Sequence, residues 1–152
     1  MKIKSLLLTA AVAGLSFSGY AQDDEKQLCM EKVSLLTNYV KQGNFVDAMT
    51  FFDEAYSKCP SIHSSLYTQG EKTFVGLLKA ETDQSKKDAL LDKFMGVYDS
   101  WIKYYGNQKR TPKYFLLGRK ANNYVKYSDE KNPDVKLKAY DWYAEALKLG
   151  GE

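Results

Sequence analysis

The residues best equipped for chemistry are two cysteines and one histidine. Cys29 and Cys59 are the only cysteines among the 152 residues, and His63 is the only histidine. A structural zinc site takes four ligands, so these three side chains do not complete one. An even number of cysteines in an exported chain instead favours a disulfide. We therefore expect a Cys29–Cys59 bond and no metal site, with two separately buried thiols as the alternative. His63 is expected at the surface or at a helix cap.

No pattern typical of catalysis is present. The sequence has no nucleophile at a recognisable spacing from a base, no glycine-rich phosphate loop and no paired-histidine motif. Its acidic residues are interspersed with lysines at expected helix starts and exposed faces. We therefore predict a protein that is not an enzyme, with no catalytic residues and no cofactor.

Composition and charge are those of an ordinary globular chain. Hydrophobic residues make up 44% and charged residues 27%, and the net charge is +3. Nucleic-acid binding needs a more concentrated basic field and is not expected. The short basic run 109–113 is interpreted as a solvated loop, with contact to acidic glycans or lipid headgroups as the alternative. The aromatic share of 14% indicates helices packed through rings or a surface that receives a partner.

The first 21 residues have the pattern of a signal peptide. Lys2 and Lys4 precede an apolar run, and Gly19 and Ala21 are small residues where a signal peptidase cleaves. The run is too short to span a bilayer as a helix, and a short membrane anchor is the alternative. We predict cleavage before Gln22, a domain at 22–152 and no membrane-spanning segment after cleavage. The style of this segment resembles signals of Gram-negative Bacteroidota.

The mature part is predicted to be all-α, with about six helices. Apolar residues recur at helical spacing in 24–42, 45–58, 62–80 and 85–105. Gly43-Asn44 ends the first of these helices, Ser61 is a candidate cap for the third and Ser85 begins the fourth. Thr111-Pro112 and Asn132-Pro133 each open a further helix, with proline in the first turn.

The helix at 85–105 carries two adjacent apolar stripes and is expected to lie inside the fold. The stripes are Leu90, Phe94, Val97 and Trp101, and Leu91, Met95, Tyr98 and Ile102. Two stripes make a wider apolar arc than a surface helix needs. The alternative is a small-molecule or glycan site built from an aromatic pocket, for which the candidates are Trp101, Tyr104, Tyr105 and Trp142.

The spacing of the cysteines agrees with an antiparallel pairing of the first two helices. Counted outward from the turn at Gly43-Asn44, Cys29 and Cys59 lie at nearly equal height on the two helices. Their side chains can then meet at the distance that a disulfide requires.

Two segments resemble the tetratricopeptide repeat. The first contains Leu35, Leu36, Tyr39 and Gly43, followed by Ala48, Phe52, Ala55 and Pro60. The second contains Tyr114, Leu117 and Gly118, followed by Ala139, Tyr143 and Ala146, with a longer turn between its helices. Lys32 and Leu36 depart from the usual residues, and the middle pair of helices is too degenerate to match, although Gly70 is a candidate for its close-approach residue.

This resemblance implies a short right-handed solenoid of helical hairpins that receives a protein or peptide segment in a concave groove. The residues implied to line the groove are Met30, Val33, Thr37, Val40, Lys41, Phe115, Arg119, Asn122 and Asn123. The alternative is that each of them is an ordinary solvated residue. We therefore expect an exported periplasmic or envelope adaptor of the Bacteroidota type, in a secretion or envelope assembly. A partner or a second copy is expected to cover the last helix, with the alternative that the chain is part of a longer polypeptide.

Overall fold

The described residues form six helices and no strand, which confirms the all-α prediction. A computed structural model describes residues 18–129 and 131–151, without the side chains of residues 18–22. The helices are α1 (Ser18–Lys41), α2 (Phe45–Lys58), α3 (Ser65–Ala80), α4 (Gln84–Tyr105), α5 (Lys113–Tyr127) and α6 (Asp134–Gly150). Most of the predicted signal peptide lies outside these residues, and its proposed cleavage point falls in the first turn of α1.

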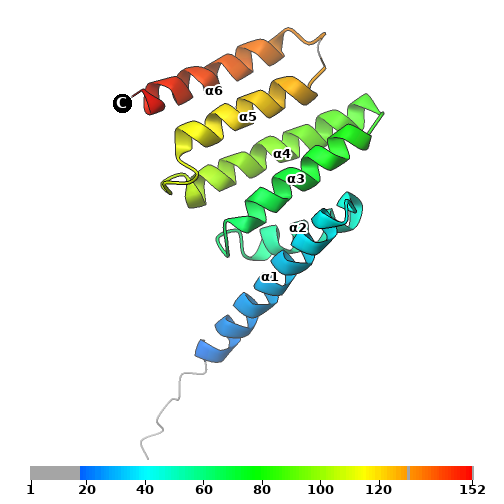
Figure 1. The fold of residues 1–152 in the computed structure, drawn as a ribbon, viewed down its shortest axis with the longest axis vertical. Helices are drawn as coiled ribbons and strands as arrows, with labels where there is room; N and C mark the ends of the chain where they lie inside the picture. Colours follow the sequence, from blue (N-terminus) through cyan, green and yellow to red (C-terminus); the bar gives the residue numbers. More distant parts are fainter. Residues whose placement is uncertain (1–17, 130, 152) are drawn as a thin grey trace, which may run out of the picture.

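Successive helices pair as antiparallel hairpins that lie in a row (Figure 1). Each helix packs against the next one along the chain, and α1 also contacts α3. Hydrogen bonds between side chains link α2 with α4 and α3 with α5. α4 therefore has α2, α3 and α5 as neighbours, whereas α6, the last helix, packs chiefly on α5.

The turn between α1 and α2 forms where it was predicted. Gly43 has a φ of +74°, the left-handed conformation that glycine adopts without a steric penalty. Asn44 then caps α2, since its side-chain oxygen accepts a hydrogen bond of 3.3 Å from the backbone N–H of Asp47. This local chemistry sets the antiparallel direction of the first hairpin.

Several predicted helix starts were wrong by a few residues. The first helix was expected to begin at residue 24, but α1 begins at Ser18. Asp83 caps α4, whose first residue is Gln84. Pro112 and Pro133 occupy the cap positions of α5 and α6, one residue before the first turn. Gly106 ends α4 in a right-handed conformation.

Ser61 does not cap α3. The exposed His63 takes part in that helix start, because its Nδ1 accepts a hydrogen bond of 3.1 Å from the backbone N–H of Ser65. This agrees with the expected helix-cap role. The loop before α3 is held by two tyrosines: Tyr67 donates to the carbonyl of Pro60, and Tyr105 donates to the carbonyl of Ser61.

The core is built from rings that contact one another across α2, α3 and α4. Phe74 and Phe94 stack with their centroids 4.9 Å apart, and Phe94 contacts Tyr98 at 5.1 Å. Trp101 continues the series, because it stacks between Tyr98 of α4 and the buried Tyr67 of α3. Six apolar residues of α4 are buried, namely Leu91, Phe94, Met95, Val97, Tyr98 and Trp101. The prediction of α4 as an interior helix is confirmed.

Cys29 and Cys59 form the predicted disulfide. Their Cα atoms are 6.3 Å apart, and the bond closes a loop with a sequence separation of 30. Cys29 is buried in α1, and Cys59 directly follows α2. The bond therefore ties the two helices of the first hairpin together at the end opposite their turn.

Gly70 is a point of close approach between α2 and α3. A Cβ atom built on Gly70 would lie 2.4 Å from Cε2 and 2.7 Å from Cδ2 of the Phe52 ring. Ala48, Phe52 and Ala55 of α2 are completely buried against this region. The small and large residues noted in the sequence thus interlock. Gly70 is a close-approach residue, but toward α2 and not, as expected, within the pair of α3 and α4.

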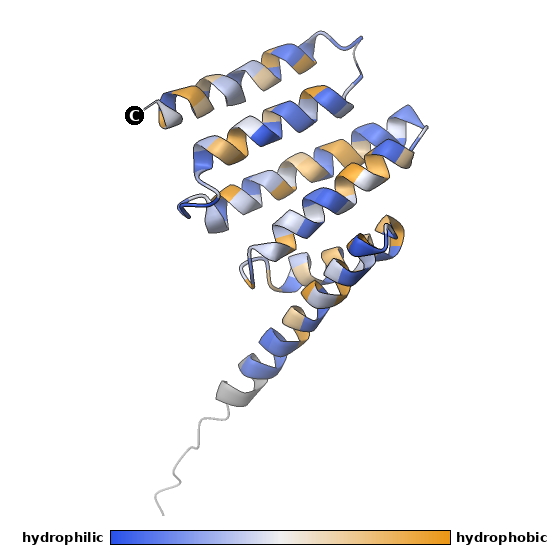
Figure 2. Ribbon diagram, in the orientation of Figure 1, coloured by the Kyte–Doolittle hydropathy of each residue, from blue (hydrophilic) through white to orange (hydrophobic). Residues whose placement is uncertain are grey.

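The beginning of α1 projects beyond the other helices (Figure 1). From residue 23 onward this part of the helix is mainly hydrophilic (Figure 2). Residues 23–28 are all exposed. None of the helices in the described part of the chain is both long enough and apolar enough to cross a membrane.

Candidate functional site: a groove along α3

An open groove lies between α3 and α5. Its volume is about 500 Å³. Its walls are Glu71, Lys72, Val75 and Lys79 from α3, and Phe115, Arg119, Asn122, Asn123, Lys126 and Tyr127 from α5. Since the two helices are separated by α4 along the chain, this groove exists only because α4 packs behind both of them.

A second hollow continues the groove along the other side of α3. It has a volume of about 600 Å³ and is lined by Val40, Phe45, Lys72, Val75, Gly76, Lys79 and Ala80. Lys72, Val75 and Lys79 line both hollows. We refer to the two together as the α3 groove. One face of α3 thus forms the middle of the groove, and α5 and the α1–α2 turn form its two sides.

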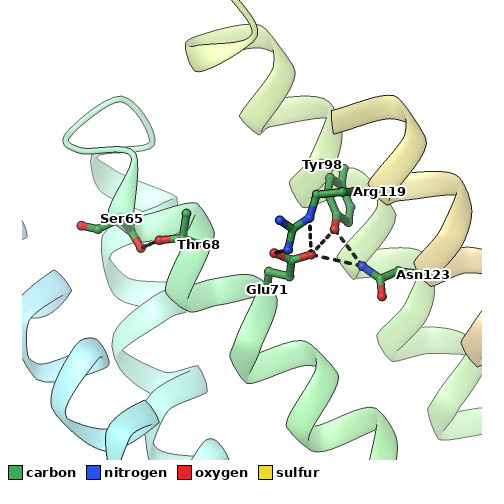
Figure 3. Close-up of polar contacts among 6 residues, drawn as sticks. All are labelled: Ser65, Thr68, Glu71, Tyr98, Arg119 and Asn123. Atoms are coloured by element: carbon green, nitrogen blue, oxygen red, sulfur yellow. Dashed lines mark hydrogen bonds and ion pairs between the residues drawn. The ribbon is translucent and has the colours of Figure 1, made fainter. Parts of the chain in front are cut away.

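A buried carboxylate forms the polar end of the α3 groove. Glu71 is only 7% exposed and lies between α4 and α5 (Figure 3). Its Oε1 accepts hydrogen bonds from the hydroxyl of Tyr98, from Nε of Arg119 at 3.1 Å and from Nδ2 of Asn123 at 3.2 Å. Its Oε2 accepts from the other end of the Arg119 guanidinium. The carboxylate of this α3 residue is therefore fully satisfied by side chains from two other helices, α4 and α5.

Burial and charge shift the pKa values within this cluster. Burial, followed by the negative charge of Glu71, raises the pKa of Tyr98 far above its usual value, so this phenol stays protonated. Burial alone would lower the pKa of Arg119, but its hydrogen bonds and attraction to Glu71 raise it overall. The cluster is thus a tyrosine donor, an arginine cation and a carboxylate acceptor in fixed positions.

Arg119 has a second contact, with an aromatic ring. Its guanidinium carbon lies 5.4 Å from the centroid of Phe115, one turn earlier on α5. The Arg119 side chain remains 44% exposed although its charge is paired with Glu71. Phe115 itself is 42% exposed. The pair presents an aromatic face and unused N–H donors to the α3 groove.

The structure brings together about half of the groove residues implied by the family resemblance. The four on α5 (Phe115, Arg119, Asn122 and Asn123) line the α3 groove, as does Val40 of α1. Of the remaining four, Val33 is a core residue and Met30 is exposed away from the groove lining. Thr37 donates to the Val33 carbonyl, and Lys41 is exposed. For Val33, the expectation of a groove residue was wrong, because α2 and α3 cover that side of α1.

The four candidates for an aromatic pocket do not gather around one cavity in the described part of the chain. Trp101 is 2% exposed and stacks between Tyr67 and Tyr98. Trp142 packs edge-on against Tyr124 on the far hairpin, and Nζ of the buried Lys120 lies 4.3 Å from its ring centroid. Tyr104 is exposed, and Tyr105 closes the loop before α3. These rings serve mainly as packing between helices.

The sequence analysis missed the residues of α3 that form the middle of the groove. None of Glu71, Lys72 and Lys79 was singled out from the sequence. One signal was available: Glu71 follows Tyr67 by four residues and precedes Phe74 by three, so it stands within the buried stripe of α3. A carboxylate at such a position requires buried partners.

Other candidate sites are weaker. The described residues contain no group of three or more histidine, cysteine, aspartate or glutamate side chains that could hold a metal ion. The outer side of α6 carries exposed apolar residues, among them Leu137, Tyr140 and Leu147, at 67%, 67% and 77% exposure. That a second copy or a partner covers them stays a prediction.

No protein-family model, curated protein or solved structure matches this chain. The resemblance to tetratricopeptide repeats therefore stands on the residues quoted from the sequence, and the candidate site on the geometry described above.

Proposed function

We propose that this protein is a non-enzymatic adaptor that holds a segment of a partner protein in the α3 groove. The observation that carries the proposal is the groove itself: an open hollow about 500 Å³ in volume between two helices, walled by both apolar and polar side chains. Extended segments bind to such surfaces when the walls supply donors for their backbone and pockets for their side chains.

The hairpin order supports a short solenoid of the tetratricopeptide type as the frame for this groove. α1, α3 and α5 are the first helices of their hairpins, and α3 and α5 are linked through Glu71 and Arg119. In such repeats the first helices line the concave side. The α3 groove is lined mainly by these helices, which is the placement that the resemblance implies.

The disulfide supports export to the periplasm or cell envelope. Structural disulfides persist in oxidising compartments, and Cys29–Cys59 joins two helices that pack closely. The proposed compartment is tested by N-terminal sequencing of protein from the native host. Export predicts a chain that begins at Gln22, whereas an intact Met1 in the cytoplasmic fraction contradicts it.

The adaptor role is tested by capture of envelope proteins on immobilised protein. We expect Phe115→Ser combined with Asn122→Ala to reduce the recovered partner strongly, because both side chains are exposed in the groove. Leu28→Ser is the control, an exposed apolar residue on α1 outside the groove. Equal recovery by all three proteins would rule out the α3 groove as the binding site.

A further inference from the structure

The lining of the α3 groove is strongly basic. Lys72 and Lys79 on α3 and Lys126 on α5 are exposed in it, together with Arg119. The only carboxylate in the lining of either hollow is Glu71. The chain as a whole has a net charge of only +3, so the groove concentrates positive charge.

Glu71 does not balance this charge. It is 7% exposed and its oxygens accept hydrogen bonds from its neighbours, chiefly from both sides of the Arg119 guanidinium. Arg119 and Glu71 therefore neutralise each other. None of Lys72, Lys79 and Lys126 forms an ion pair with another residue of the described chain. Three positive charges remain uncompensated around the groove.

Apolar side chains lie between these lysines. Val75 is half-buried in the middle of the groove, with Val40 and Phe45 on one side and the exposed ring of Phe115 on the other. Lys126 lies over the ring of Tyr127, with Nζ 5.5 Å from its centroid. A bound molecule must therefore offer both negative charge and apolar surface to use the whole groove.

We infer that the occupant of the α3 groove is an acidic protein segment in which aspartate or glutamate residues alternate with apolar or aromatic ones. This inference rests on the proposed function and names the chemistry of the partner. Carboxylates of the segment pair with Lys72, Lys79 and Lys126, and its apolar side chains lie on Val75 and Phe115. A purely anionic ligand would leave the apolar middle of the groove uncovered.

The test uses a fluorescein-labelled peptide of about 12 residues in which glutamate alternates with leucine and phenylalanine. Its binding to the full chain, with the disulfide intact, is followed by fluorescence anisotropy. Two matched peptides replace either every glutamate by glutamine or every apolar residue by serine. We expect each replacement to weaken binding about tenfold or more, and the acidic peptide to bind more weakly at 300 mM than at 50 mM salt, because salt screens exposed charges.

Charge reversal on the protein locates the site. We expect Lys72→Glu with Lys79→Glu to weaken binding of the acidic peptide about tenfold, from two lost attractions between exposed charges and two new repulsions. Lys86→Glu with Lys109→Glu makes the same change in net charge on exposed lysines outside the groove and should change binding less than about twofold. Circular dichroism verifies that both variants fold.

Each other outcome overturns the inference in a distinct way. Equal binding of the glutamine peptide removes the role of charge, although the groove still binds a segment. Equal weakening by both pairs of reversals, or equal binding of the serine peptide, indicates general attraction of anions. If the acidic peptide does not bind while Phe115→Ser with Asn122→Ala still abolishes partner capture, the chemistry proposed for the occupant is wrong and the adaptor role stands.

Discussion

Replacing Gly70 with alanine tests a close contact between the first two hairpins. The new methyl carbon would lie 2.4 Å and 2.7 Å from two ring carbons of Phe52. Real Cβ atoms do not approach carbon that closely, so the ring or the helix must move. The ring has little freedom, because it is completely buried, stacks on Tyr56 at 5.2 Å and meets Phe74 edge-on at 5.5 Å.

Two terms of opposite sign set the expected size of the effect. Overpacking a tight core site costs about 1–3 kcal/mol. Replacing glycine by alanine inside a helix stabilises the helix by about 1 kcal/mol. Because the overlap at Gly70 is severe and the Phe52 ring is confined, we place the cost near its upper end and expect a net loss of about 1–2 kcal/mol in the free energy of unfolding.

The matched control is Gly96→Ala in α4. A Cβ atom built on Gly96 meets nothing within 4 Å, and the residue lies inside a helix as Gly70 does. Only the difference in helix propensity then applies, so we expect Gly96→Ala to raise the free energy of unfolding by about 0.5–1 kcal/mol. The two substitutions are chemically identical and should have opposite signs.

The assay is urea unfolding followed by circular dichroism, with the disulfide intact, for the unchanged protein and both variants. A lower midpoint for Gly70→Ala and a higher one for Gly96→Ala, at equal slopes, is the expected result. In a Phe52→Leu background the cost of Gly70→Ala should shrink, since the ring it would strike is gone. If Gly70→Ala is as stable as Gly96→Ala, α2 and α3 do not pack as described.

Three further predictions concern the disulfide and the Glu71 cluster. Replacing Cys29 and Cys59 by serine should lower the free energy of unfolding by about 3–4 kcal/mol on the chain-entropy basis, and a change below about 1 kcal/mol in calorimetry would contradict the described bond. Arg119→Glu should lower the free energy of unfolding in urea by about 2–4 kcal/mol, since it places a second carboxylate beside buried Glu71. Arg119→Met should lower it less, and equal stability of both variants would count against the ion pair. The pKa of Tyr98 is raised in the fold, so its contribution to the free energy of unfolding is full below pH 10 and is lost as the pH rises above that value. The free energy of unfolding should therefore fall more steeply with alkaline pH in the unchanged protein than in Tyr98→Phe. Identical pH profiles would argue against the burial of its hydroxyl.

The Arg119 result also bears on how the groove is probed. The sequence presents Arg119 as a plausible contact for a partner, and charge reversal there would be the natural test. The structure shows that Arg119 holds Glu71, so reversal changes folding and binding together. Lys72 and Lys79 are better probes, because both are exposed and neither takes part in an ion pair in the described chain.

Local features of the fold were predictable from the sequence, because they depend on neighbouring residues. The helical periodicity, the turn at Gly43 and the height of Cys29 and Cys59 each follow from one segment or from two adjacent ones. The interior position of α4 followed from the width of its apolar arc. Helix starts were less certain: a proline suits either the cap or the first turn, and Pro112 and Pro133 both took the cap.

The candidate site was only partly predictable, because it joins helices that are distant in the chain. Glu71 and Arg119 are 48 residues apart, and their contact depends on how α3, α4 and α5 pack. A lysine such as Lys72 has the same local pattern whether it faces bulk water or a groove. The placement of Val33 in the core shows the converse, since a repeat pattern assigns a face to a helix but does not say what covers it.

Photo-crosslinking from the α3 groove tests the central claim most directly. The full chain is prepared with p-benzoylphenylalanine in place of Asn122, which is exposed in the groove, or of Tyr140, which is exposed on α6. Each protein is irradiated in an envelope extract, and the crosslinked peptides are identified by mass spectrometry. The account predicts one recurrent partner segment, rich in acidic and apolar residues, crosslinked from position 122 and absent from position 140. The same segment crosslinked only from position 140 would contradict the assignment of the α3 groove as the binding site.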